Sequence, residues 1–207
     1  MTKLYIMRHS IPMREFIGIN NSNDVDQLRN EKNILSVEGE KLAQEKSMIK
    51  ELQNIDVLYS SNYVRAMSTA RYIAYNNNID LNIDEGLGER KFGVDSSLLP
   101  KGYFKTQWVD HDFKMENGES VNDTSKRMKN TIDRIINENN GKTICMVSHG
   151  TAMAAYLLNY CNLETNGEEF KFTFNGNVIA EGFIPVLDLY ELEFDNNNEL
   201  ISIKNIR

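Results

Sequence analysis

The fold is decided by a stretch close to the amino end, which reads Lys3-Leu4-Tyr5-Ile6-Met7-Arg8-His9-Ser10. Its first part is a short apolar run, the pattern of a strand that is buried on both faces of a sheet. The run ends in a guanidinium, an imidazole and a hydroxyl. Ligands of parallel α/β sheets bind just beyond the carboxyl ends of strands, so Arg8 and His9 stand where a site is expected.

A second stretch has the same construction and reads Thr143-Ile144-Cys145-Met146-Val147-Ser148-His149-Gly150. Two of the three histidines in the chain therefore follow apolar strands. A single histidine in such a place is often a purely structural residue. Two of them, one with an arginine beside it, favour a shared site.

Composition limits the class of protein. The chain has 207 residues, of which 41% are hydrophobic and 26% charged, which suits one α/β domain over residues 1–207. A net charge of −7 argues against a nucleic-acid or anionic-membrane partner, although it leaves room for a local basic pocket. Cys145 and Cys161 lack a metal-ligand spacing. The sequence contains no signal peptide or membrane span, so we expect a cytoplasmic protein. Because no cluster of ligand residues is recognised, we also expect no metal and no cofactor.

Apolar periodicity predicts an α/β fold of three layers, a mostly parallel central sheet with helices on both faces and a closing hairpin at the carboxyl end. Strands are expected at residues 4–7, 55–59, 81–84, 143–147, 190–194 and 201–204. Helices are expected at 36–53, 63–74, 120–138 and 150–163, with Ser36 and Ser120 as N-caps. Residues 11–34 are interpreted as a long loop.

Arg65 lies in the first turn of the helix that follows Ser60-Ser61. A cation there opposes the helix dipole, and local rules are most often broken at functional sites. A solvated surface arginine is the alternative. A strand end, a serine turn and a helix N-terminus would together form a cradle for an anion, with the guanidinium as a bidentate donor.

The glycines around Glu89, in Glu85-Gly86-Leu87-Gly88-Glu89, indicate an irregular backbone that places a side chain. Glu89 is the candidate general acid, with Glu85 and Glu119 as competing carboxylates. Residues 94–118 mix aromatic and lysine side chains, among them Trp108 and Lys105. We expect this segment to be an irregular, cap-like insertion that covers the site and selects the substrate.

Several motifs occur in one order along the chain: Arg8-His9, Ser60-Ser61 with Arg65, Leu87-Gly88-Glu89, Gly118-Glu119-Ser120 and Ser148-His149-Gly150. In this ordered set the chain resembles the histidine phosphatase superfamily, in its phosphoglycerate-mutase-like branch. The likeness spans nearly the whole length.

The resemblance implies a role for each residue of the set. His9 would be the nucleophile that becomes phosphohistidine, and Glu89 would protonate the leaving group. The phosphoryl oxygens would be bound by Arg8, Arg65 and His149, helped by backbone N–H groups near Gly150.

The activity implied by the resemblance is that of a metal-independent phosphomonoesterase acting on a small phosphorylated metabolite. A phosphoglycerate mutase and a non-catalytic module that binds a phosphorylated ligand are the alternatives. The sequence departs from the family after His9, where Ser10-Ile11-Pro12 replaces the usual Gly, Glu or Gln, and Thr, and again at Val94-Asp95-Ser96. These departures affect substrate contacts. Neither the substrate nor the oligomeric state can be predicted.

Such chemistry requires a neutral imidazole. The ordinary pKa of histidine is about 6.5, and the neighbouring cations Arg8 and Arg65 would lower that of His9. One basic pocket would therefore prepare the nucleophile and also bind the dianionic phosphate.

Overall fold

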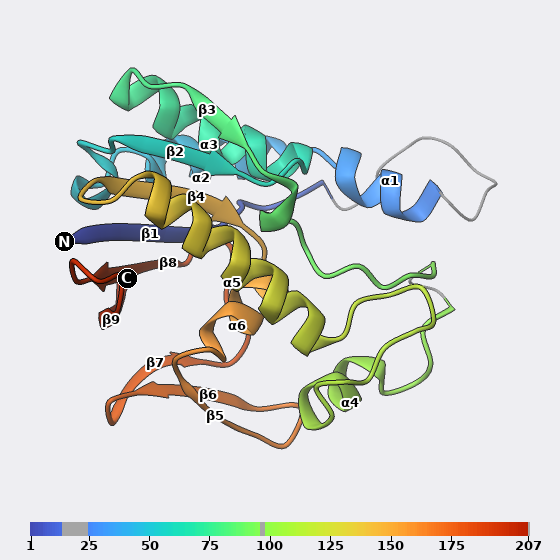
Figure 1. The fold of residues 1–207 in the computed structure, drawn as a ribbon. Helices are drawn as coiled ribbons and strands as arrows, with labels where there is room; N and C mark the ends of the chain where they lie inside the picture. Colours follow the sequence, from blue (N-terminus) through green and yellow to red (C-terminus); the bar gives the residue numbers. More distant parts are fainter. Residues whose placement is uncertain (14–24, 96–97, 207) are drawn as a thin grey trace.

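The centre of the molecule is a six-stranded sheet with the order β3-β2-β4-β1-β8-β9 (Figure 1). The computed structural model describes residues 1–13, 25–95 and 98–206. The strands of this sheet are β1 (Thr2–Arg8), β2 (Val57–Ser60), β3 (Leu81–Ile83), β4 (Thr143–Ser148), β8 (Leu189–Phe194) and β9 (Leu200–Ile206). The first four are parallel, while β8 runs antiparallel to β1 and β9 antiparallel to β8. The predicted sheet and its closing hairpin are confirmed.

Helices cover both faces of the sheet, giving the expected three layers. One face carries α2 (Val37–Lys46) and α3 (Val64–Asn77), and the other α5 (Val121–Glu138) and α6 (Gly150–Leu157) (Figure 1). The alternating side chains of β1 serve both layers: Leu4 and Ile6 belong to the core under α5 and α6, whereas Tyr5 and Met7 belong to the core under α3. All four are at most 5% exposed, as the unbroken apolar run predicts.

Two predicted helix starts are confirmed. The Ser36 Oγ accepts a hydrogen bond from the backbone N–H of Gly39 at 2.9 Å. Ser120 and Asp123 form a reciprocal capping box at the start of α5, which satisfies two donors that a helix N-terminus would otherwise leave unpaired.

Two predicted helix ends are wrong. The helix from Ser36 ends at Lys46 and is followed by a 3-10 turn, η1 (Lys50–Leu52). There the buried Ser47 donates its hydroxyl to the Gln44 carbonyl at 2.6 Å, a local bond that competes with helix continuation. The helix after His149 ends at Leu157, and Leu163 lies in a strand instead.

The expected long loop at 11–34 is also partly wrong. Residues 25–32 form α1 (Val25–Lys32), supported by a bond from the Gln27 side-chain amide to the Glu31 carboxylate at 2.8 Å. Such an i,i+4 pair stabilises a short helix that has weak apolar periodicity. Residues 14–24 of the predicted loop lie outside the described residues.

A second, three-stranded antiparallel sheet was not predicted. It consists of β5 (Asn162–Thr165), β6 (Phe170–Phe174) and β7 (Asn177–Glu181). Between β6 and β7 the chain turns at Asn175 and Gly176, whose φ angles are 48° and 78°. Positive φ at both central residues is typical of a tight hairpin turn, and an Asn-Gly pair favours it.

The segment 94–118, which we expected to be irregular, contains the helix α4 (Tyr103–Val109). This helix packs against the small sheet, since the rings of Trp108 and Phe170 lie 5.2 Å apart. The helix is too short for a periodic pattern to appear in the sequence, so tertiary packing determines it.

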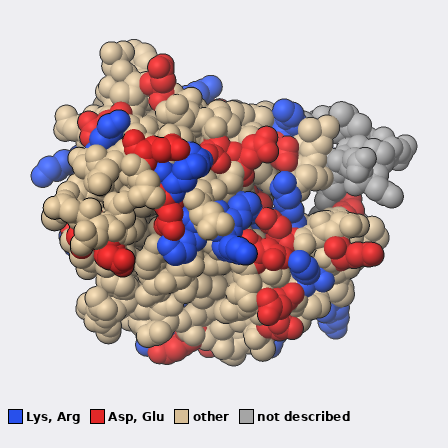
Figure 2. Space-filling view, viewed as in Figure 1, with Lys and Arg blue, Asp and Glu red and all other residues tan. Residues whose placement is uncertain are grey.

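On the face that carries α5, Lys and Arg side chains lie among Asp and Glu side chains (Figure 2). Two of the ion pairs of α5 are Lys129–Asp133 and Arg134–Glu138, both with i,i+4 spacing. Such exposed pairs stabilise a helix by only ~0.3–0.5 kcal/mol each. None of the described helices has the length and apolar character needed to cross a lipid bilayer.

Candidate active site

The pairing of three parallel strands brings the candidate residues to one edge of the sheet. In the registers, Arg8 of β1 is opposite Ser148 of β4, and Ser60 of β2 is opposite Val147. The residues after these strand ends are therefore neighbours, and the His9 and His149 rings are 5.0 Å apart. The two histidines thus share one site, as the sequence predicts.

The His9 imidazole is held by one contact at each ring nitrogen. Its Nδ1 lies 2.6 Å from the Ser10 carbonyl oxygen, which can only accept, and its Nε2 lies 3.0 Å from the Arg65 Nε, which can only donate. The neutral ring is therefore protonated at Nδ1 and has its lone pair at Nε2. Only 3% of the residue is exposed.

His149 is oriented in the same way by its own partners. Its Nδ1 lies 3.2 Å from the Arg65 Nη2 and its Nε2 lies 2.7 Å from the Ser61 Oγ. Because the guanidinium can only donate, the neutral ring carries its proton on Nε2 and donates it to Ser61. The Tyr63 ring packs edge to face on the imidazole, with centroids 4.5 Å apart.

Arg65 therefore bridges the two imidazoles. It is buried in the first turn of α3, where the sequence left a surface arginine as an alternative; the burial removes that alternative. Its Nη1 donates to the Asn30 carbonyl of α1 at 2.5 Å. Its own carbonyl accepts from the Thr69 hydroxyl at 2.8 Å, and the Thr69 Oγ1 in turn accepts from the Ser10 backbone N–H at 3.0 Å. This chain of bonds fixes α3 to the end of β1.

Ser10, which departs from the family pattern, has a structural contact. Its hydroxyl donates to the Gly39 carbonyl at 2.7 Å, and the residue is completely buried. A Cβ added at Gly39 would lie 2.1 Å from the Ile11 carbonyl oxygen. Glycine is therefore required where the chain after His9 lies on α2.

Arg8 reaches the site from the other side. Its Nη1 donates to the Ile184 carbonyl at 2.5 Å, while its buried Nε has no hydrogen-bond partner among the described residues. A Cβ added at Gly150 would lie 3.3 Å from the Arg8 Cζ, so the glycine lets the guanidinium lie against the first turn of α6. Burying a guanidinium N–H without a hydrogen-bond partner is energetically unfavourable. We therefore expect an acceptor for the Arg8 Nε–H at this site.

The electrostatics of the cluster favour neutral imidazoles. Burial, and after it the Arg65 charge, hold the pKa of both His9 and His149 well below the usual 6.5. For His9 the bond to the Ser10 carbonyl opposes this shift only partly. Burial also lowers the pKa of Arg8 and Arg65, against the opposing charge of Glu89. Near neutral pH the site thus holds two cations and two neutral rings.

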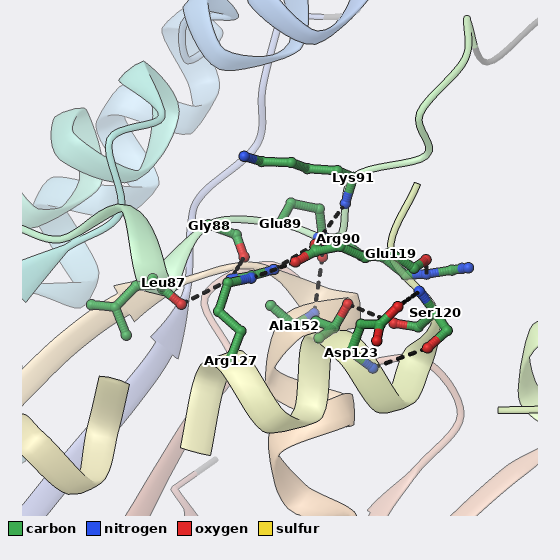
Figure 3. Close-up of polar contacts among 12 residues, drawn as sticks. Leu87, Gly88, Glu89, Arg90, Lys91, Glu119, Ser120, Asp123, Arg127 and Ala152 are labelled. Atoms are coloured by element: carbon green, nitrogen blue, oxygen red, sulfur yellow. Dashed lines mark hydrogen bonds and ion pairs between the residues drawn. The ribbon is translucent and has the colours of Figure 1, made fainter. Parts of the chain in front are cut away.

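Glu89 lies at the N-terminus of α6 (Figure 3), and its charge acts on both Arg8 and Arg65. One carboxylate oxygen accepts from the backbone N–H groups of Ala152 and Arg90, both at 2.9 Å, and the other from that of Thr151 at 3.3 Å. A helix N-terminus is a favourable place for an anion. Glu89 is the carboxylate that the structure brings to the two arginines.

The loop that carries Glu89 is held by Arg127 of α5, a residue that the sequence analysis missed. Its Nη1 donates to the carbonyls of Gly86, in η2 (Glu85–Leu87), and of Gly88, at 2.8 and 3.1 Å. Its Nε and Nη2 donate to the Glu119 carboxylate at 2.6 and 2.8 Å (Figure 3). Arg127 carries no distinguishing signal in the sequence, because a charged residue beside an apolar stripe is ordinary for a surface helix.

The competing carboxylates have other positions. Glu119 is paired with Arg127 and accepts from the Lys91 backbone N–H at 3.0 Å. Burial acts to raise the pKa of Glu119, but the hydrogen bond and charge of Arg127 outweigh burial and hold it below the usual value. Glu85 is exposed on η2.

A cavity of about 260 Å³ opens beside Arg8, Glu89 and Gly150. Its other walls are largely aromatic and come from α4, from β6 and from the segment before β8, namely Phe104, Trp108, Phe170, Phe172 and Phe183. The last three were missed in the sequence. The alternation of Phe170-Lys171-Phe172-Thr173-Phe174 is the signal that could have placed Phe170 and Phe172, because residues two apart on a strand face the same side. Phe183 lies outside this alternation.

Lys105, which the sequence analysis placed among the substrate-selecting residues, does not line this cavity. Its ammonium group pairs with the exposed Glu168 carboxylate at 3.2 Å. Within the described ranges no group of three or more His, Cys, Asp or Glu side chains is arranged to hold a metal ion.

The family model of the histidine phosphatase superfamily (branch 1) matches residues 4–178. A search of curated proteins gave no match.

Several solved structures have the same fold. Mycobacterial glucosyl-3-phosphoglycerate phosphatase, in complex with VO3, is 15% identical with a TM-score of 0.68, over 98% of this chain and 96% of that chain. A variant of phosphoserine phosphatase from Entamoeba histolytica, in complex with phosphoserine, is 21% identical with a TM-score of 0.64, over 99% and 97%. A putative alpha-ribazole-5'-P phosphatase from Escherichia coli is 18% identical with a TM-score of 0.65, over 100% and 97%. With the family model covering most of its length, this chain belongs to branch 1 of the histidine phosphatase superfamily.

Proposed function

We propose that the chain is a metal-independent phosphomonoesterase that hydrolyses a small phosphorylated metabolite through a phosphohistidine at His9. The observation that carries the proposal is the pair of contacts on the His9 ring. The Ser10 carbonyl fixes the proton on Nδ1, and Nε2 faces the Arg65 guanidinium with its lone pair. A neutral imidazole held in one tautomer among cations is suited to attack a dianionic phosphate.

In the first step the His9 Nε2 forms a bond to phosphorus while the bond from phosphorus to the ester oxygen breaks. The incoming phosphate takes over the donors of Arg65, which leaves the His9 lone pair free, and also the Nε of Arg8. Phosphoryl transfer depends chiefly on such positioning and charge stabilisation, and these two arginines supply the positive charge without a metal.

The Glu89 carboxyl enters this step protonated and gives its proton to the ester oxygen as the bond to phosphorus breaks, so the group leaves as a neutral alcohol and Glu89 is left as a carboxylate. In the second step the same carboxylate removes a proton from water, whose oxygen attacks phosphorus as the bond to His9 Nε2 breaks. The products are the alcohol, inorganic phosphate and the free enzyme. Glu89 borders the cavity together with Arg8, which supports this role.

We further propose that the chain forms one domain and that residues 94–118 are a cap-like insertion over the site. The two ends of this segment meet, since a Cβ added at Gly93 would lie 2.2 Å from the backbone nitrogen of Gly118. Between these ends, Phe104 and Trp108 line the cavity.

A phosphate-release assay with excess chelator tests the activity. The purified protein is incubated with a panel of phosphomonoesters, beside an Arg8→Met variant and the exposed control Arg71→Met. Chelator-resistant release by the parent and the control, with a loss of ~10²-fold or more in Arg8→Met, is expected. Binding of phosphate without release from any ester would instead favour the non-catalytic module.

A further inference from the structure

The proposed phosphatase site opens onto a cavity whose chemistry narrows the substrate class. We infer that the preferred substrate is the monophosphate ester of an apolar, preferably aromatic, alcohol with no second charged group. The inference rests on the proposed function only for the place of the phosphoryl group, which is the end of the cavity formed by Arg8, Glu89 and Gly150.

The side walls of the cavity are aromatic on several sides. Trp108, Phe170 and Phe172 are at most 4% exposed and form its inner part. Phe170 contacts both Trp108 and Phe183, with ring centroids 5.2 and 4.6 Å apart. Rings at such spacings support one another, so the walls are preformed rather than assembled by the ligand.

The mouth of the cavity exposes two more large apolar side chains. Phe104 is 52% exposed and Phe183 60% exposed, and both line the cavity. Neither contributes its full apolar area to the core of the protein. Exposed aromatic rings at the entrance of a pocket are typical of a site that binds an apolar group.

The charged groups along the described walls are Arg8 and Glu89, and both lie at the phosphoryl end. None of the three lysines of segment 94–118 lines the cavity. Lys105 pairs with Glu168, and Lys114 pairs with Asp123 at 2.6 Å. A carboxylate on the alcohol portion, such as phosphoserine or phosphoglycerate carries, would lose water among aromatic rings without gaining a cation. Unpaired burial of a charge is strongly unfavourable, so the cavity selects against these metabolites.

The size of the cavity agrees with a small alcohol. Its volume of about 260 Å³ is slightly below the ~300–1,000 Å³ range of pockets for drug-sized ligands. It suits one or two fused rings, or a short branched alkyl chain.

The first test compares matched esters on the parent enzyme. We measure kcat/KM for 2-naphthylmethyl phosphate, methyl phosphate, phosphoserine and 3-phosphoglycerate. All four leave as alkoxides, so their leaving groups need similar protonation. We expect the naphthylmethyl ester to exceed each of the others by ~10–100-fold, the discrimination that an apolar pocket provides. A preference for phosphoserine or 3-phosphoglycerate would overturn the inference.

The second test uses the double variant Phe104→Ser/Phe183→Ser. Both side chains are more than half exposed, and the unfolding midpoint is measured alongside to show that the variant folds. The ratio of kcat/KM for naphthylmethyl over methyl phosphate should fall by ~10-fold. Tyr75→Ser, an 87% exposed tyrosine on α3, is the matched control and should keep the parent ratio. An unchanged ratio in the double variant contradicts the inference.

Direct binding separates this inference from the proposed activity. Calorimetry compares naphthylmethylphosphonate with phosphonoacetate, neither of which is hydrolysed. Tighter binding of the aromatic phosphonate by ~10-fold or more, in a protein that hydrolyses no ester, would leave the inference standing and remove the proposed function. Turnover of esters together with equal or weaker binding of the aromatic phosphonate would support the proposed function and overturn the inference about the substrate.

Discussion

Strand β1 leads into two polar clusters a few residues apart, and they differ in charge balance. In the first, the Glu191 carboxylate accepts from the Tyr5 hydroxyl at 2.7 Å and from the ammonium groups of Lys3 and Lys204 at 3.2 and 3.3 Å. In the second, His9 and Arg8 lie beside Arg65 and His149. Lys3 also pairs with the Glu193 carboxylate at 3.3 Å, so the first cluster has two carboxylates for its two ammonium groups. Among the described residues, the second has one carboxylate, that of Glu89, acting on its two guanidinium groups.

This difference separates a cluster built for stability from one built for a ligand. Burial acts to raise the pKa of Glu191, but the hydrogen bonds from Tyr5 and Lys3 outweigh burial and hold this pKa below its usual value. The folded state therefore favours the charged carboxylate. At the site, by contrast, burial and Arg65 hold the pKa of His9 well below 6.5. The missing acceptor there is what an incoming phosphate would supply.

The largest effect is expected for Glu89→Gln. Alkyl phosphates leave as alkoxides and need a proton, so phosphorylation of His9 by them should slow by ~10²–10⁴-fold. Nitrophenyl phosphate leaves as a stable phenolate and barely needs one. With this ester the variant should release a burst of nitrophenolate followed by slow turnover, because the second step still lacks its base.

Stopped-flow absorbance measures that burst. Glu85→Gln, an exposed carboxylate on the neighbouring η2, is the matched control and should behave as the parent. Parent-like turnover of Glu89→Gln on both esters would show that another group moves the proton.

Arg65→Met should cost the next largest amount, ~10²–10³-fold in kcat/KM, as expected when a charged donor to the transition state is removed. It should also move the pH profile. The Arg65 charge lowers the pKa of His9, so its removal raises that pKa. Since the protonated ring cannot attack, the acid limb of kcat/KM should move toward neutral pH.

The pH profile of kcat/KM checks this shift, with Arg71→Met as the control on the same helix, because Arg71 is exposed and pairs with Glu40. The unfolding midpoint is measured alongside. An acid limb that stays in place while the rate falls would indicate that Arg65 does not act on His9.

Glu191→Ala should affect stability and leave the kinetics as they are. Removing the carboxylate leaves the Tyr5 hydroxyl without its partner, and losing a buried hydrogen-bond partner costs ~1–3 kcal/mol. Urea unfolding gives the free energy, and Glu193→Ala, which removes the more exposed carboxylate of the same strand, should cost less. An equal loss of unfolding free energy in the two variants would mean that the burial of Glu191 and its bond to Tyr5 add nothing to stability.

The sequence predicts the centre of this molecule well and its periphery poorly. The apolar run at residues 4–7 predicts a buried strand, because such a run that ends abruptly in polar residues is typical of a strand with a site at its end. Arg8-His9 and Ser148-His149 are weak signals singly and indicate a shared site only together. The parallel pairing of β1 with β4 then brings the two histidines together. That is why sequence reasoning alone could assemble this part of the site.

The parts that sequence reasoning missed depend on tertiary contacts. Arg127 reaches the carbonyls of Gly86 and Gly88 from a distant helix, which nothing in its local sequence indicates. The helix α4 packs on the small sheet through Trp108 and Phe170, which are far apart in the sequence. Local propensity is a weak guide for so short an element.

The smallest effect is expected for Lys105→Ala. The sequence suggested that this lysine helps to select the substrate, but its side chain pairs with Glu168 on the surface. An exposed pair contributes ~0–1 kcal/mol. Neither kcat/KM on any ester nor the unfolding free energy should change beyond that margin, and a selective loss on one ester would place Lys105 at the substrate after all.

The central claim is that His9 carries the phosphoryl group, and trapping the intermediate tests it most directly. The Glu89→Gln variant is mixed with a radiolabelled aryl phosphate, quenched within the burst and digested, and the labelled peptide is identified. We predict a label that is stable in base and labile in acid on the peptide containing His9, at close to one phosphate per chain. A label on Ser10 or His149, or turnover that persists in His9→Ala, would contradict the account.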